Sequence, residues 1–369
     1  MLCGACCSSP SQLTGVAAGL VANDDTPLSV WASRFVTDGE RRYNFTGNRK
    51  IGVRQVPPLA GHKSDHKPFW MAIPVKYPRG ATINDVVWTE ARFYVRREQA
   101  IASAVMGPQC KMPLAGNSKL PLVLDVGANT GYFSLLAAAC GCRAMAFEPR
   151  TDMASFIQLS ARFNGFGPNQ LALYNKLVTH EKNVKFDGWN AVSTAETLSG
   201  RAASGRGCRK GSKCATEAAA KDARMASFSE NAVAIDELVS EDVLYLKVDV
   251  EGHEPSALRS ARSLIQEHTV HYILFEITHY LFGAFTTGKY IKVLQWLDQR
   301  GYTLHHVETA NFLMDEKSAK LPTGSAALAT WMGLKAKGCN TQAATFCQAG
   351  NIFAVHPKAR WPLRRTRIE

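Results

Sequence analysis

From Leu122 onward the chain alternates short, continuously apolar segments with helical ones, and this alternation restricts the fold more than any other feature. Continuous apolar runs of about four to eight residues are typical of strands that are buried on both faces. Helical segments between such strands favour a parallel sheet that helices cover on both sides. The sequence therefore predicts an α/β fold with a doubly wound, seven-stranded, mostly parallel sheet. The expected strands are residues 122–126, 143–148, 171–178, 243–250, 271–277, 302–307 and 351–357.

The same pattern divides the chain into parts. The core domain is expected at residues 121–357, and a low-complexity basic insert, predicted to be disordered, interrupts it at 190–230. The preceding extension, 31–120, contains an expected strand at 69–75 and an expected helix at 84–106, which we regard as a possible lid over the core. The remaining parts are a disordered N-terminus at 1–30 and a basic tail at 358–369.

The net charge of +12, from 43 basic and 31 acidic residues, at first suggests an anionic partner. However, residues 201–224 and 357–369 supply nine of the twelve excess charges. The remainder of the chain is close to neutral, so the folded body has no basic face. This distribution argues against nucleic acid as the partner, although a basic loop that holds RNA phosphates stays open as an alternative.

The cysteines and the N-terminus bear on the compartment. Of the ten cysteines, Cys3 and Cys6 form a single C-x-x-C with no second pair, which argues against zinc. The first 23 residues carry no charge and so lack the basic region of a secretory signal. No stretch is apolar for the roughly 18 residues that a membrane span needs. We therefore expect a cytoplasmic protein with mostly unpaired thiols, against which the glycosylation pattern at 44–46 is the opposing signal.

The turn after the first predicted strand carries the clearest chemical motif. Asp125 lies near the end of this strand, and glycines at 127 and 131 let the backbone turn sharply and approach a ligand without a Cβ in the way. The second strand ends in Glu148, 23 residues after Asp125, where an acid can accept both hydroxyls of a ribose. Together the loop and the acid predict an adenosine-containing cofactor.

The glycine spacing distinguishes between cofactors. Dinucleotide folds use G-x-G-x-x-G, in which the middle glycine admits a pyrophosphate close to the backbone. Here Asn129 occupies that position, which argues against NAD or FAD. A smaller ligand with a carboxylate and no phosphate fits the loop better, and S-adenosylmethionine is such a ligand.

The segments LVLDVGANTGYFS, AFEP, LYLKVDVEGHEPSALRSARSLI and ILFEITH, in this order over residues 121–280, resemble the FkbM family of S-adenosylmethionine-dependent methyltransferases. The resemblance implies a Rossmann-like class I methyltransferase fold. It also implies methyl transfer to a hydroxyl oxygen of a sugar or another small metabolite, so the expected partner is a small-molecule or glycan hydroxyl acceptor. By the same resemblance Glu148 would hold the ribose. The residues implied to line the methionine part of the cofactor are Asp125, Gly127, Ala128, Asn129 and Gly131.

The end of the fourth strand holds five ionisable groups within residues 247–254, where a buried strand end needs none. A hydroxyl acceptor is too weakly acidic to attack a methyl group unaided, so a general base should be present. Asp249 is favoured for its position nearest the strand terminus. A salt bridge between Lys247 and Glu251, or Mg²⁺ bound by the carboxylates, would be alternative explanations. The candidate catalytic residues are Asp249, Glu251 and His253, followed by Glu276 and His279.

Two other classes of function stay open. A nicotinamide-dependent oxidoreductase could use a related sheet, although the missing middle glycine counts against it. A cofactor-binding module that no longer catalyses could use the basic insert as its contact surface. Hydrolase and NTPase functions find no support, since the chain contains neither H-E-x-x-H nor a G-x-x-x-x-G-K that is followed by the Ser or Thr of a phosphate-binding loop.

Overall fold

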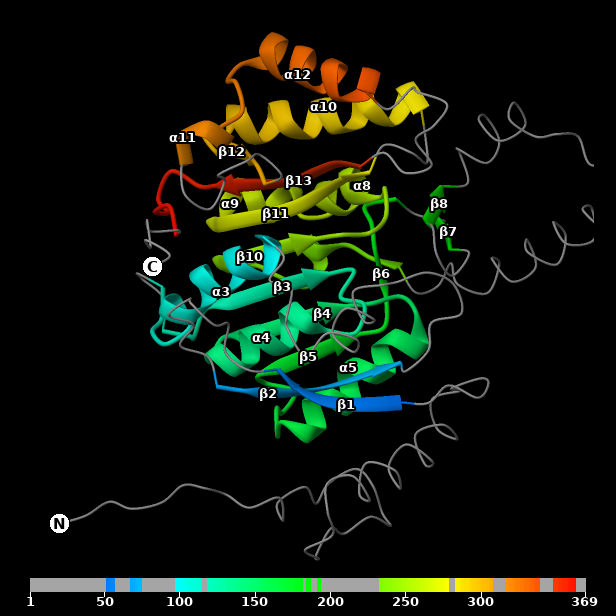
Figure 1. Ribbon diagram of the computed structural model, residues 1–369, viewed down its shortest axis with the longest axis vertical. Helices are drawn as coiled ribbons and strands as arrows, with labels where there is room; N and C mark the ends of the chain where they lie inside the picture. Colours follow the sequence, from blue (N-terminus) through cyan, green and yellow to red (C-terminus); the bar gives the residue numbers. More distant parts are fainter. Residues whose placement is uncertain are drawn as a thin grey trace, which may run out of the picture.

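A seven-stranded sheet forms the centre of the computed structural model (Figure 1). The structure describes residues 51–56, 67–74, 97–114, 118–181, 184–186, 191–193, 232–278, 283–307, 316–338 and 348–362. The strand order is β12-β13-β11-β10-β3-β4-β5. The strands are β3 (Leu122–Val126), β4 (Arg143–Phe147), β5 (Leu171–Tyr174), β10 (Val243–Val248), β11 (Val270–Thr278), β12 (Thr303–His306) and β13 (Gln348–Val355).

The direction of winding reverses next to β3. From β3 the chain moves outward through β4 to β5, and it then returns to place β10 and β11 on the other side of β3. These five strands pair in parallel, whereas β13 pairs antiparallel with both β11 and β12. The predicted doubly wound, mostly parallel sheet is thus confirmed. Ligands of such sheets bind at the carboxyl ends of the strands where the order reverses, which here means the ends of β3 and β10.

Helices cover both faces of the sheet, as the continuous apolar strands require. One face packs against α3 (Arg97–Gln109), α4 (Tyr132–Cys140) and α5 (Thr151–Phe163). The other packs against α8 (Glu254–Arg259), α9 (Arg262–Glu267), α10 (Gly283–Gln299) and α12 (Ser325–Gly338). Two short helices complete the described chain, η3 (Ile235–Glu237) and α11 (Glu316–Ala319).

Three two-stranded sheets flank this core. In the first, β1 (Ile51–Val56) pairs antiparallel with β2 (Phe69–Pro74), and β2 lies along α5, where the Ser160 hydroxyl accepts a hydrogen bond from the Ala72 N–H at 2.9 Å. The expected strand at 69–75 is therefore present. The other two sheets pair β6 (Leu177–Val178) with β9 (Ala232–Val233) and β7 (Val184–Phe186) with β8 (Ala191–Ser193).

Two expected elements are divided in the structure. The strand expected at 171–178 separates into β5 and β6, because the Asn175 side chain donates to the backbone carbonyls of Glu148 and Pro149 and draws the chain out of the sheet. Pro255 also predicts the start of a single helix, because proline is favoured at the first helical position, but the structure divides this segment into α8 and α9. The Ser260 hydroxyl donates to the Ala257 carbonyl at 2.7 Å where α8 ends.

The N-terminal extension departs from expectation in two ways. The helix expected at 84–106 is described only as α3, which begins at Arg97, and residues 84–96 lie outside the described ranges. The expectation of mostly unpaired thiols is wrong for Cys110 and Cys142, which form a disulfide between the end of α3 and the start of β4. Their spacing of 32 residues gave no hint of this pairing, because only the packing of α3 beside α4 brings the two together.

Several other expectations concern residues outside the described ranges: the N-terminus at 1–30, the histidine at 279, and the basic insert at 190–230 apart from β8. Among the helices that the structure describes, none has both the length and the apolar character needed to cross a bilayer.

Candidate active site

The glycine loop leads from β3 into α4 at the reversal point of the sheet. Gly127 and Gly131 have φ angles of +74° and +89°, and Asn129 between them has a φ of +53°. A Cβ on Gly127 would lie 1.9 Å from the carbonyl oxygen of Asp249, so only glycine lets the loop lie against the end of β10. Asn129 is exposed, whereas Ala128 and Gly131 are buried. The loop is therefore wound tightly and fixed to the neighbouring strand.

Asp125 lies beneath this loop and is fully buried. Its Oδ2 accepts hydrogen bonds from the Ser134 N–H at 3.0 Å and from the Ser134 hydroxyl at 2.5 Å. Its Oδ1 lies 3.6 Å from the Nζ of Lys247. The carboxylate therefore connects β3, α4 and β10 below the loop, so its side chain acts as a support.

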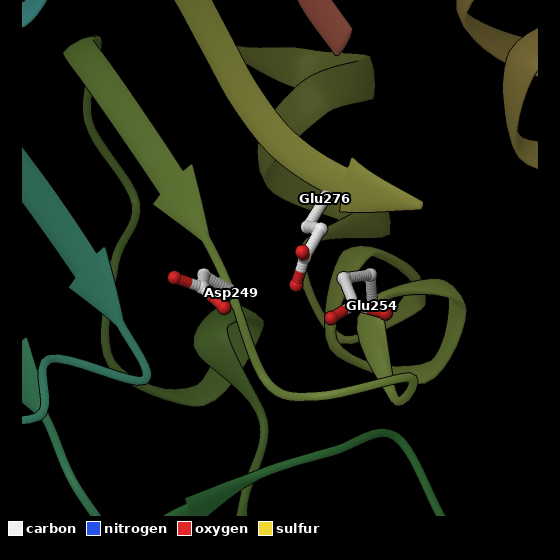
Figure 2. Close-up of side chains that lie close together, drawn as sticks. All are labelled: Asp249, Glu254 and Glu276. Atoms are coloured by element: carbon white, nitrogen blue, oxygen red, sulfur yellow. The ribbon is translucent and has the colours of Figure 1, made fainter. Parts of the chain in front are cut away.

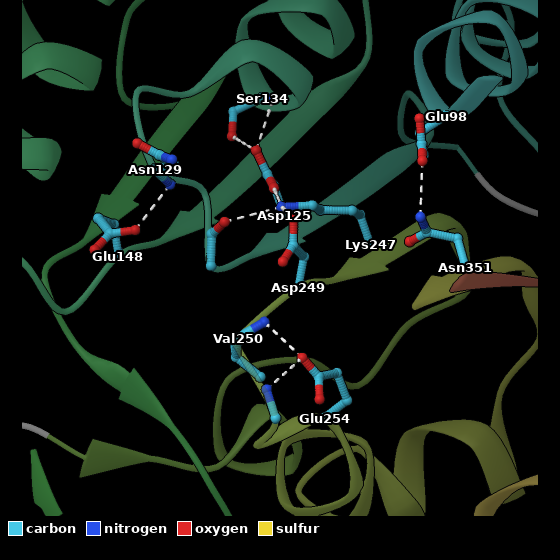
Figure 3. Close-up of polar contacts among 12 residues, drawn as sticks. Glu98, Asp125, Asn129, Ser134, Glu148, Lys247, Asp249, Val250, Glu254 and Asn351 are labelled. Carbon is cyan, nitrogen blue, oxygen red and sulfur yellow. Dashed lines mark hydrogen bonds and ion pairs between the residues drawn. The ribbon is translucent and has the colours of Figure 1, made fainter. Parts of the chain in front are cut away.

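Glu148 reaches back from the end of β4 to the loop. One of its carboxylate oxygens accepts the backbone N–H of Asn129 at 2.8 Å (Figure 3). The other accepts the backbone N–H of Arg150 at 2.9 Å. Burial raises the pKa of this carboxyl to about 7, although the two N–H groups act in the opposite direction. Each oxygen keeps a lone pair that a further donor could use. A buried acid that already orders the loop is thus present at the expected position.

Lys247 connects the loop to the end of β10. Its Nζ donates to the carbonyl oxygen of Gly127 at 2.9 Å, lies 3.4 Å from Asp249 Oδ2, and stands 5.3 Å from the centre of the Phe133 ring. The Lys247 side chain is only 6% exposed. Burial lowers the pKa of its ammonium, but the carboxylates of Asp249 and Asp125 outweigh this effect, so the pKa is raised. Lys247 is therefore charged and held by two acids.

Three carboxylates point toward one another beside this lysine (Figure 2). Asp249 follows β10, Glu276 lies in β11, and Glu254 begins α8; one oxygen of each lies within 4.8 Å of the others. Glu254 is fully buried, and its carboxylate accepts three hydrogen bonds. The donors are the N–H groups of Val250 and Gly252, both at 3.0 Å, and the hydroxyl of Tyr290. Burial raises its pKa to about 7. Its contacts hold the turn that follows Asp249.

The structure separates the three residues that the sequence grouped as catalytic candidates. Asp249 is 44% exposed at the strand end, where its carboxylate contacts Lys247. Glu251 is exposed and has a φ of +53°, so the chain reverses there, and His253 is buried at the start of α8. The alternative salt bridge between Lys247 and Glu251 is wrong, because Lys247 pairs with Asp125 and Asp249.

Sequence reasoning missed two contributors. Glu254 was not singled out, although an acid four residues after Val250 and directly before Pro255 is a recognisable signal for the start of a helix. The role of Lys247 depends on the register in which it faces Asp125 across the pair β10–β3, and this register is not visible in the sequence. The carboxylates that lie together are Asp249, Glu254 and Glu276, not Asp249 and Glu251.

A sheet wound in this order, with a glycine loop after its first core strand and an acid after the next, defines a Rossmann-like fold. Residues 125–304 match the methyltransferase FkbM domain, so the chain carries an FkbM methyltransferase domain. This match confirms the family predicted from the sequence motifs, and methyltransferase is the class of enzyme that it assigns. No curated protein sequence matches the chain.

Solved structures with low sequence identity are also similar to the chain. A methyltransferase FkbM from Methylobacillus flagellatus is 16% identical with a TM-score of 0.27, over 42% of this chain and about a third (32%) of that one. An O-methyltransferase from Bacillus cereus in complex with SAH is 11% identical with a TM-score of 0.30, over 76% and 93% of the two chains. One from Brevibacillus brevis, with S-adenosyl-L-homocysteine, is 10% identical with a TM-score of 0.34, over 76% and 81%.

The residues of the loop suit S-adenosylmethionine, the cofactor that the family resemblance implies. Glu148 is an acceptor whose burial is costly until donors such as ribose hydroxyls reach it. Gly127 and Gly131 carry no Cβ, so the backbone at these two positions allows close approach of a ligand. The cofactor expected from the glycine spacing therefore agrees with the family of the domain.

Proposed function

We propose that the protein is an S-adenosylmethionine-dependent O-methyltransferase that acts on a hydroxyl group of a sugar or another small metabolite. The observation that carries this proposal is the half-exposed carboxylate of Asp249 at the end of β10, a residue whose backbone lies directly against the glycine loop. A carboxylate at this position can accept the proton of a hydroxyl as its oxygen attacks. S-adenosylmethionine would supply an electrophilic methyl group on a sulfonium centre.

The cofactor would be held by the loop and by Glu148. The backbone from Gly127 to Gly131, with Ala128 and Asn129 between them, would line the methionine part. Glu148 would accept the ribose hydroxyls with the lone pairs that the Asn129 and Arg150 N–H groups leave available. Asp125 would act from below, through the contacts that fix the loop.

The acceptor would approach from the side of Asp249 and Glu276. Asp249 is the general base in this proposal because it is the more exposed of the two, and Glu276, only 8% exposed, would orient the hydroxyl. A general base at this step contributes roughly 10²–10⁴ in rate. Glu251 and His253 take no direct part, since one is exposed on a reversed turn and the other is buried in the start of α8.

The experiment is a transfer assay with purified protein, S-adenosylmethionine and a panel of free sugars and methyl glycosides, in which S-adenosylhomocysteine is measured. The wild-type protein should produce it with a subset of the panel, and Asp249→Asn should reduce turnover at least 100-fold while binding S-adenosylhomocysteine normally. Asp242→Asn, at the opposite end of β10, is the matched control and should retain activity. Protein that binds NAD but neither S-adenosyl compound would contradict the proposal.

A further inference from the structure

The ammonium of Lys247 occupies the junction between the cofactor loop and the acceptor side of the site (Figure 3). It donates to the Gly127 carbonyl on one side and contacts the Asp249 carboxylate on the other. It also lies opposite Asp125, the residue that supports the loop from below. One buried cation thus contacts groups that the proposed function assigns to two different ligands.

We propose that Lys247 is a positioning residue that holds the Gly127 turn in its cofactor-binding shape and offsets the charge of Asp249 beside the sulfonium. This inference rests on the proposed function and adds to it a residue that neither ligand needs to touch. Its first part follows from geometry. The carbonyl of Gly127 accepts a hydrogen bond from Lys247 at 2.9 Å, and the Gly127 Cα lies against the backbone of Asp249, so the ammonium and the strand end together fix the turn.

The second part follows from charge. Asp249 lies near Glu254 and Glu276, and carboxyl groups so close together repel one another when they are ionised and no cation compensates them. Lys247 supplies that cation at 3.4 Å from Asp249. S-adenosylmethionine carries a positive charge at its sulfur, whereas S-adenosylhomocysteine is neutral there. The ratio of the affinities for these two ligands should therefore depend on whether Lys247 compensates the negative charge of Asp249.

The test compares Lys247→Met with the wild-type protein by calorimetric titration of both S-adenosyl compounds. Loss of the hydrogen bond to Gly127 should weaken S-adenosylhomocysteine binding about tenfold or more. Because Asp249 is then uncompensated, S-adenosylmethionine should lose less, and its affinity relative to S-adenosylhomocysteine should rise severalfold. Asp249→Asn should lower this ratio. Tyr245→Phe, two residues earlier on the same face of β10 and buried, is the matched control and should change neither value.

Removal of the ammonium also leaves Asp125 as a buried, uncompensated acid, which could prevent folding. The double variant Asp125→Asn/Lys247→Met removes both charges and is compared with Asp125→Asn alone, with thermal unfolding used to verify the fold. The proposal requires the added Lys247→Met change to weaken S-adenosylhomocysteine binding further and to raise the ratio. Equal affinities within twofold, or an equal loss for both compounds, would overturn it.

These outcomes separate the two proposals. Wild-type protein that binds neither S-adenosyl compound would overturn the proposed function and this inference together. Wild-type protein that binds both compounds, with variants that behave like the Tyr245→Phe control, would overturn the role of Lys247 alone.

Discussion

Replacement of Gly127 by alanine tests whether the contact between the glycine loop and the end of β10 shapes the site. The residue has a φ of +74°, which side chains other than glycine rarely adopt. Its new Cβ would lie 1.9 Å from the carbonyl oxygen and 2.8 Å from the carbonyl carbon of Asp249. Both are backbone atoms, so no side-chain rotation relieves the overlap. The loop and the strand end must move apart.

The control is Gly165, which has a φ of +69° but no atom within 4 Å of an added Cβ. Gly165→Ala should therefore cost only the left-handed conformation, about 1–2 kcal/mol of the free energy of unfolding. Gly127→Ala incurs the same cost and the strain of separating two packed backbones, about 1–3 kcal/mol more by analogy with overpacked cores. The difference between the variants isolates the contact.

The assay is urea unfolding of both variants together with calorimetric titration of S-adenosylhomocysteine. Because separation also moves the Gly127 carbonyl away from Lys247, Gly127→Ala should lose at least tenfold in affinity. Gly165→Ala, which is remote from the loop, should bind within twofold of the wild-type protein. Equal losses of stability in the two variants, or normal ligand binding by Gly127→Ala, would refute the argument that this contact positions the loop.

Three further predictions concern the support of the site. Burial raises the pKa of Glu148 to about 7 from 4.5, so the unfolded chain loses its proton first, and the free energy of unfolding should fall by on the order of 3 kcal/mol between about pH 4.5 and 7. Glu148→Gln should lack this part of the decline in urea unfolding at the two pH values. Ser134→Ala removes a 2.5 Å hydrogen bond to the buried carboxylate of Asp125 and should destabilise the fold by about 1.5–3 kcal/mol; an unchanged midpoint would contradict the supporting role. Replacing Cys110 and Cys142 by serine opens a link across 32 residues and should cost about 3–4 kcal/mol, with the variant insensitive to dithiothreitol and the wild-type protein sensitive to it.

The sheet was predictable because its strands are buried on both faces, which leaves a run of apolar residues in the sequence for each of them. Helix packing on both sides makes this signal strong for β3 and β10, every residue of which is buried. The signal is weaker where local polar contacts decide. Asn175 ends β5 through its bonds to two backbone carbonyls, and no periodicity reveals such a contact.

The glycine loop and Glu148 could be located from the sequence because the local chain determines both: two glycines for a tight turn, and an acid at the end of the next strand. The partner of Lys247 could not be identified from the sequence. Lys247 and Glu251 are close in sequence, but the chain leaves the strand after Lys247 and turns at Glu251, whose backbone is left-handed. Register across β10 and β3 places Asp125 opposite Lys247 instead, and such register depends on the whole sheet.

The position of Asp125 indicates what the acid of the D-x-G-x-x-x-G motif (residues 125–131) does in this fold. The carboxylate is fully buried, its Oδ2 accepts two hydrogen bonds from Ser134, and its Oδ1 lies 3.6 Å from the Lys247 ammonium. We therefore expect it to act on the loop from below rather than to contact the ligand. This position requires an anion because its side chain joins Ser134, at the start of α4, to the ammonium of Lys247 on β10. The glycine loop and the end of β10 therefore depend on each other electrostatically. Asp125 holds Lys247, and Lys247 in turn donates a hydrogen bond to the carbonyl of Gly127 in the loop. A chain that kept the glycines but lost Lys247 would leave the buried charge of Asp125 uncompensated beneath its cofactor. We therefore expect the glycine motif and the K-x-D segment at 247–249 to function only together.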